Sequence, residues 1–105
     1  MTRDVNRGSS DRGVLVLTSL AESPKHGYAL IKDIEEFAGV TLGAGTLYGA
    51  LGMLEKAGLV EALPAEGRRR PYQITAAGRE QLRARLTEAA HIAEVGLRRI
   101  ATALS

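Results

Sequence analysis

Cysteine and tryptophan are both absent from this sequence of 105 residues, and other aromatic side chains are scarce. The lack of cysteine excludes disulfides, thiol nucleophiles and cysteine zinc sites, and it is consistent with a reducing cytosol. Three tyrosines and one phenylalanine are the only aromatic residues, so a single chain has little material for a large aromatic-lined pocket. The hydrophobic content of 45% allows one small core, and the length fits one domain.

Metal sites, membrane spans and catalytic groupings are also missing from the sequence. His26 and His91 are the only histidines and stand far apart, so no metal-ligand spacing exists and we expect no cofactor. No apolar run approaches the roughly 20 residues of a membrane span, and residues 1–11 lack the apolar region of a signal peptide. We therefore expect a cytoplasmic protein without a membrane partner. No serine, histidine and aspartate are arranged together and no glycine-rich phosphate loop follows a strand, so we expect no enzyme activity.

Charged residues are present but nearly balanced, with a formal net charge of +2. Their distribution is more informative, because Arg68, Arg69 and Arg70 are adjacent whereas acidic residues gather in other segments. Such a basic cluster is suited to phosphate, since the planar guanidinium group can bond two phosphate oxygens at once. A solvated turn is the alternative.

The hydrophobic pattern predicts helices separated by one hairpin. Gly39 and Gly58 are placed to end the second and third helices, and Thr75 is placed to cap the last one. The arginine cluster falls at the tip of the hairpin. The expected helices cover residues 12–22, 26–39, 44–58 and 76–105, and the expected hairpin strands cover 59–63 and 70–75. A strand is the alternative for residues 12–22, where the break before Pro24 favours a helix.

This order of elements predicts a winged helix-turn-helix, a mainly α fold with a small β-hairpin. The second and third helices form the helix-turn-helix and the hairpin is the wing, so the third helix would enter the major groove of DNA. Arg70 could instead support its strand, and packing between helices is the favoured role of Tyr28. The expected DNA contacts are Thr46, Tyr48, Gly49, Gly52, Met53, Arg68, Arg69, Arg70, His26 and Tyr28.

The third helix contains glycines where alanine would form a better helix. Leu47, Leu51 and Leu54 form its inward stripe, and Gly49 and Gly52 lie off that stripe. Each glycine inside a helix costs about 1 kcal/mol relative to alanine. We interpret both glycines as a face without side chains that lets the backbone approach DNA closely. Simple tolerance on a solvent-exposed face is the alternative.

The last helix predicts a dimer. A helix of about 25 residues is roughly 40 Å long, so it overhangs a small core unless another chain covers its apolar stripe. Residues 12–22 are apolar nearly all round, which also favours a second chain. Packing of the last helix on its own core is the alternative. The expected dimer interface consists of Leu15, Leu82, Leu86, Ala89, Ala93, Leu97, Ile100 and Leu104.

Three motifs occur in order along the chain: HGYALI, GTLYGALGMLEKAGLV and GRRRPYQITAAGR. Together they resemble the PadR family of bacterial winged-helix transcription regulators, and the single long final helix resembles the short subgroup of that family. The resemblance implies a homodimer, joined through the first and last helices, that binds an inverted-repeat operator in double-stranded DNA and represses transcription. Many members are induced by a small molecule bound near the dimer interface, so the resemblance also suggests an effector there. Position 49 is often proline in the family and is glycine here.

The expected domains are a flexible N-terminal arm over residues 1–11, the winged helix-turn-helix over 12–75 and a dimerisation helix over 76–105. The expected function is a sequence-specific DNA-binding transcriptional regulator. A dimeric winged-helix protein-interaction module without operator binding remains the alternative. It is kept open by the net charge of only +2 and by the lack of arginine or lysine on the exposed N-terminal half of the third helix.

Overall fold

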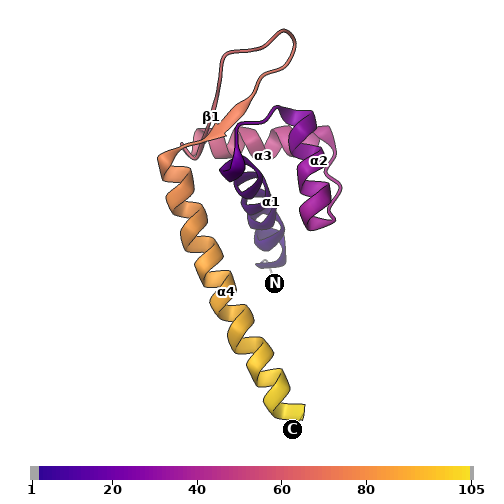
Figure 1. The fold of residues 1–105 in the computed structure, drawn as a ribbon, viewed down its shortest axis with the longest axis vertical. Coiled ribbons are helices and arrows are strands. Elements are labelled where there is room, and N and C mark those ends of the chain that lie inside the picture. The colour runs from indigo at the N-terminus through magenta and orange to yellow at the C-terminus, as the bar shows by residue number, and fades with distance from the viewer. Residues whose placement is uncertain (1–2, 105) are drawn as a thin grey trace.

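The elements of the computed structural model follow the order of three helices, a hairpin and a long helix. The structure describes the backbone of residues 3–104 and the side chains of residues 12–103. Figure 1 shows α2 and α3 beside one end of α1, the hairpin beyond them, and α4 running away from them. This order confirms the predicted mainly α fold with a small hairpin. The elements are α1 (Arg3–Glu22), α2 (Gly27–Ala38), α3 (Ala44–Lys56), β1 (Val60–Ala62), β2 (Tyr72–Ile74) and α4 (Ala76–Leu104).

One hydrophobic core joins the first three helices, the hairpin and the start of α4. Each helix has an apolar stripe, and these stripes are buried against one another because burial removes apolar surface from water. α1 is central to this arrangement, since it contacts the three other helices and β2. The core side chains are Val16, Leu17, Leu20, Leu30, Ile34, Leu42, Leu47, Leu51, Val60, Ile74 and Leu82.

α1 is longer than the sequence predicts. Residues 1–11 were expected to form a flexible arm before a helix at 12–22, whereas the helix begins at Arg3. Once the apolar part has formed its turns, each further residue adds a backbone hydrogen bond without new nucleation, so a polar segment can continue the helix. Residues 1 and 2 lie outside the described part of the chain.

Gly58 ends α3, as predicted. The amide of Leu59 donates to the carbonyl of Leu54 (2.9 Å), and the amide of Gly58 donates to the carbonyl of Glu55 (3.0 Å). This pair of bonds is the Schellman arrangement, which satisfies carbonyl groups at the end of a helix. The φ angle of Gly58 is 79°, in the left-handed region that strains residues with a side chain. The chain therefore turns sharply from α3 into the hairpin.

Thr75 caps α4, which confirms the sequence prediction. Its hydroxyl oxygen accepts a hydrogen bond from the amide of Gly78 (3.0 Å), and its hydroxyl donates to the carbonyl of Gly58 (2.7 Å). A Cβ at Gly78 would overlap the carbonyl oxygen of Leu59, so only glycine allows this close approach. These contacts fix the start of α4 against the end of α3.

The hairpin has a short antiparallel base and an extended tip. β1 pairs with β2 along three residues of each strand. Further out, the backbone groups of Glu66 and Arg69 bond each other across a two-residue turn. Gly67 has a φ of 65° and is the first central residue of this turn, and a positive φ at that position alone is the pattern of a type II′ turn. Arg68 is consequently at the tip of the wing.

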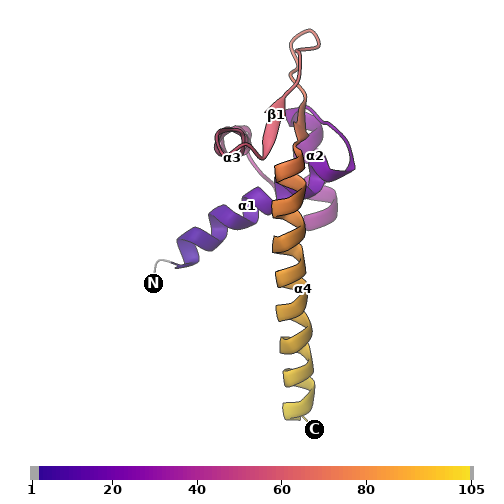
Figure 2. The same ribbon diagram turned by 90° about the vertical axis from the view of Figure 1, so that its left-hand side faces the viewer.

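α4 extends well beyond the core. Its 29 residues give a length of about 44 Å at 1.5 Å per residue, and the molecule measures 59 × 28 × 26 Å. Figure 2 shows the C-terminal half of α4 apart from the other elements, and the N-terminal end of α1 projecting to one side. Within the described residues, none of the helices combines the length and the apolar character needed to cross a membrane.

Candidate nucleic-acid interface

α3 buries its predicted leucine stripe and exposes the rest of its surface. Leu47 and Leu51 are buried and Leu54 is partly buried against the core. A Cβ at Gly49 or Gly52 would meet no atom within 4 Å, so packing within the chain does not require either glycine. The residues predicted to contact DNA from this helix are all exposed: Thr46, Tyr48, Gly49, Gly52 and Met53.

Tyr48 extends from α3 over the first residue of α2. A Cβ at Gly27 would overlap the phenol oxygen of Tyr48, so glycine is needed at this position for the tyrosine to lie there. Tyr48 is still 50% exposed. Gly27 is a site residue that sequence reasoning missed. The available signal was a glycine, rather than a better helix former, at the first residue of the helix.

A groove of about 690 Å³ lies between α1, α3 and α4. Val14 of α1 and Met53 of α3 are among the apolar residues that line it, and Arg12 and Arg85 are among the basic ones. Neither arginine has an ion-pair partner among the described residues. Gly49 lines the same groove. The predicted DNA-facing residues of α3 are therefore divided, since Thr46, Gly49 and Met53 line this groove whereas Tyr48 adjoins α2.

The wing places its arginines in three different environments. Arg70 Nη1 donates to the carbonyl of Leu63 (3.0 Å), which favours its alternative role of supporting the strand. Arg69 Nη1 lies 3.4 Å from Nε2 of His26. Arg68 has no hydrogen-bond or ion-pair partner in the described part of the chain. Arg68 and Arg69 are thus the wing side chains available for a phosphate.

The start of α2 adjoins the wing. His26 is the N-cap residue, yet its side chain makes no capping hydrogen bond, and its ring is half-buried beside Arg69. Tyr28 is 67% exposed, so the expectation that it packs between helices is wrong. The reason is geometric: Gly27 and Leu30 occupy the buried side of the first turns, which directs the intervening Tyr28 outward.

An apolar stripe remains exposed along α4. Leu97 is 69% exposed and Ile100 is 59% exposed. Leu82 differs from this pattern, because it is 6% exposed and belongs to the core of its own chain, and Leu15 packs partly against that core. The side chain of Leu104 lies outside the described residues. The other predicted interface residues, Leu86, Ala89 and Ala93, are exposed.

An exposed helix on a buried leucine stripe, followed by a hairpin with a basic tip, defines a winged helix-turn-helix protein of the DNA-binding class. The family model described as the transcriptional regulator PadR-like family matches residues 16–84, more than half of the chain. The chain therefore belongs to the PadR-like family of transcriptional regulators. The description of this family is one of transcriptional regulators.

Solved structures and a curated relative resemble the chain closely. A PadR family transcription regulator from Clostridium difficile has 25% identity and a TM-score of 0.73, with 80% of this chain and 92% of that one covered. A PadR family regulator from Eggerthella lenta has 31% identity and a TM-score of 0.70, with 95% of this chain and 88% of that one covered. An uncharacterised 37.1 kDa protein in transposon Tn4556 of Streptomyces fradiae is 50% identical over 74 residues, or 70% of this chain. The chain spans 21% of the length of that relative.

Proposed function

We propose that the protein is a homodimeric repressor that binds an inverted-repeat operator and is released from it by a small-molecule effector. One observation carries the proposal: residues from three parts of the fold lie next to one another. Tyr48 of α3 lies on Gly27 at the start of α2, and the neighbouring His26 lies beside Arg69 of the wing. A recognition helix, a helix N-terminus and a basic wing are the parts that a winged helix uses on DNA.

Each of these parts supplies a different contact. Tyr48 and Thr46 have hydroxyl groups that can bond phosphate and fix α3 in the major groove of DNA. His26 provides no side-chain cap, which leaves the first amides of α2 available for a phosphate. Arg68 and Arg69 add charge that Thr46, Tyr48 and the glycines of α3 cannot supply. We expect these arginines to provide the main salt-dependent part of the affinity.

The exposed stripe of α4 supports the proposed dimer. Leu97 and Ile100 are large apolar side chains with most of their surface in water, on a helix that extends beyond its own core. Burying such side chains against a second copy would contribute about 1.5–3 kcal/mol each. A two-fold dimer presents two copies of α3, and it would read two half-sites one helical turn of DNA apart, about 34 Å.

The groove between α1, α3 and α4 is the proposed effector site. It joins the recognition helix to both helices that we assign to the dimer interface. A ligand held there would alter how α3 sits against α1 and α4, and therefore the separation of the two recognition helices. A changed separation no longer matches the spacing of the half-sites, which releases DNA. Repression, rather than activation, follows the usual mode that the family resemblance implies.

Binding to candidate operators tests this function. Labelled duplexes from the DNA upstream of the protein's own gene and its neighbours are titrated with the protein in a fluorescence anisotropy assay, against a scrambled duplex. We expect one duplex to bind at least about 1000-fold more tightly than the scrambled one. A footprint should show two symmetric half-sites.

Matched variants locate the contact. Arg68→Ala with Arg69→Ala should weaken binding, whereas Arg98→Ala with Arg99→Ala removes equal charge from the far end of α4 and should leave the affinity nearly unchanged. If every duplex binds no better than the scrambled sequence, operator binding is wrong. The protein would then be a dimeric interaction module, a reading that the low net charge of +2 keeps as the second candidate.

A further inference from the structure

The loop between α1 and α2 pairs with the wing. The amide of Lys25 donates to the carbonyl of Tyr72 (3.1 Å), and the amide of Tyr72 donates to the carbonyl of Lys25 (2.9 Å). Tyr72 is the first residue of β2 and directs both of its backbone groups to this loop. The return strand of the wing is thus held from outside the hairpin, two residues after the arginine cluster.

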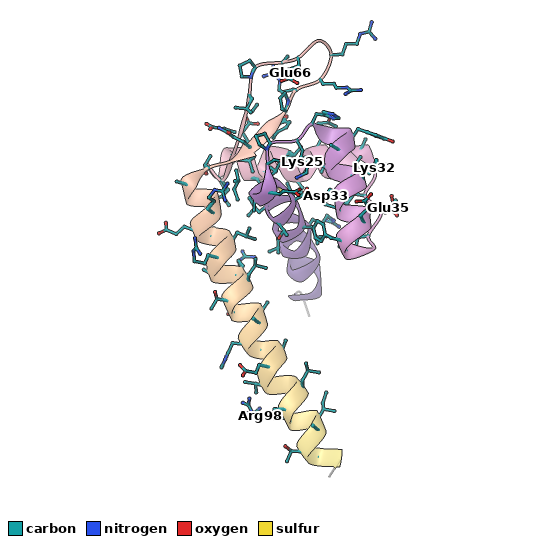
Figure 3. The ribbon with its side chains drawn as sticks, in the orientation of Figure 1. Lys25, Lys32, Asp33, Glu35, Glu66 and Arg98 are labelled. Atoms are coloured by element: carbon teal, nitrogen blue, oxygen red, sulfur yellow. The ribbon has the colours of Figure 1, made fainter. Side chains whose placement is uncertain are left out.

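The side chain of Lys25 fixes the loop to two helices. Its ammonium group donates to the carbonyl of Ser19 (2.6 Å) and to the carboxylate of Glu22 (3.0 Å), both on α1. It also lies 4.0 Å from the carboxylate of Asp33 on α2. The hydroxyl of Ser19 donates to that same carboxylate (2.6 Å). Figure 3 shows Lys25 and Asp33 close to each other between α1 and α2.

This ammonium group is not an ordinary surface charge. The Lys25 side chain is only 12% exposed, and Ser19 is fully buried, so few water molecules can replace the contacts. A buried charge that loses its partners is costly, and a buried carbonyl that loses its donor is left unsatisfied. The backbone of Lys25 is therefore held in one place relative to α1 and α2.

We propose that Lys25 is a positioning residue for DNA binding: its ammonium group anchors the loop between α1 and α2, and the loop fixes the wing arginines relative to α3. The inference rests on the proposed DNA-binding function. The adjacent residue His26 contacts Arg69, so the same loop meets the wing at two points. Lys25 also connects α1, which we assign to the dimer interface, to the wing.

The first test uses the free protein and needs no DNA. Hydrogen exchange of the wing amides, including that of Tyr72, is measured in wild type, Lys25→Met and Lys32→Met. Lys32 is an exposed α2 residue, so its variant removes the same charge without touching the anchor. We expect at least about threefold faster exchange in the wing of Lys25→Met only, because local opening depends on local contacts. Equal exchange in all three proteins overturns the inference.

The second test is a double-mutant cycle on operator binding. Lys25→Met should weaken binding by about tenfold and lower the salt slope by about 1, because wing phosphate contacts are lost. In a chain that already carries Arg68→Ala and Arg69→Ala, Lys25→Met should weaken binding no more than Lys32→Met does. An undiminished loss in that background means that Lys25 acts elsewhere, and it overturns the inference. Lys25→Arg should restore part of the affinity, which a purely steric defect would not predict.

The outcomes separate the two proposals. If the wild-type protein binds no operator, the proposed function is wrong, and so is the part of this inference that concerns DNA. The exchange data still decide whether Lys25 holds the wing. If Lys25→Met does not fold, Glu22→Gln weakens the same ammonium contact at an exposed side chain. It should accelerate exchange in the wing in the same direction, and unchanged exchange there overturns the inference.

Discussion

Replacing Gly49 and Gly52 with alanine tests two properties of α3 independently: the stability of the helix and its close approach to DNA. Both glycines lie inside the helix, and a Cβ at either would meet no atom within 4 Å, so alanine introduces no overlap. Alanine is favoured over glycine inside a helix by about 1 kcal/mol, which gives about 2 kcal/mol for the double variant. Urea unfolding at one fixed protein concentration measures this, and for a small protein the midpoint should rise by about 1 M.

The same double variant is expected to bind its operator more weakly. If the α3 backbone lies close to DNA, the two methyl groups must fit into a packed contact, and such overpacking costs about 1–3 kcal/mol. This corresponds to about a 5- to 150-fold loss of affinity. Gly52→Ala is the more direct variant, because Gly49 also lines the groove with α1 and α4.

Two results would refute this reasoning. A double variant that is more stable and binds the operator as tightly as wild type would show that the glycines are merely tolerated on an exposed face. A variant without any gain in stability would show that the helix does not bear the expected cost of glycine. Light scattering on each variant checks that the oligomeric state is unchanged.

Three further tests by substitution concern the fold and the dimer. Thr75→Ala removes the cap of α4 and should lower the free energy of unfolding by about 1–2 kcal/mol in urea, and an unchanged midpoint would argue against the cap. Gly27→Ala places a methyl group on the phenol oxygen of Tyr48, which is the far end of a half-exposed side chain, so the tyrosine should move aside and the free energy of unfolding should change by less than about 0.5 kcal/mol. A larger loss in urea that Tyr48→Ala relieves would show that Tyr48 is fixed on Gly27. Leu97→Glu with Ile100→Glu should yield the mass of one chain by light scattering, and a retained dimer mass would place the interface elsewhere.

Local sequence predicts most of the fold. The leucine spacing of α3 identifies its buried stripe, and the ends at Gly58 and Thr75 follow from residues whose backbone chemistry is local. The wing arginines form a cluster that can be recognised in the sequence. Their place at a hairpin tip after a helix-turn-helix predicts that they contact phosphate. These features are predictable because each depends on residues close together in the chain.

The contacts that assemble the interface are not predictable in this way. Lys25 meets Tyr72, and Gly27 meets Tyr48, across separations that no helical or strand pattern encodes. Periodicity also fails to say which part of an apolar stripe is covered by the chain itself. For this reason Leu82 was predicted at the dimer interface, although it is a core residue. The length of α1 exceeds the prediction because helix propagation can include polar residues that show no apolar pattern.

The central claim is that this winged helix binds DNA through α3 and the arginine tip of its wing. The salt dependence of operator binding tests this claim most directly. The affinity of wild type, Arg68→Ala/Arg69→Ala and Arg98→Ala/Arg99→Ala is measured by anisotropy over a series of salt concentrations. We predict a steep negative slope for wild type and for the α4 variant, and a slope shallower by about 2 for the wing variant. An equal slope for wild type and the wing variant, or operator binding no tighter than to a scrambled duplex, would contradict the claim.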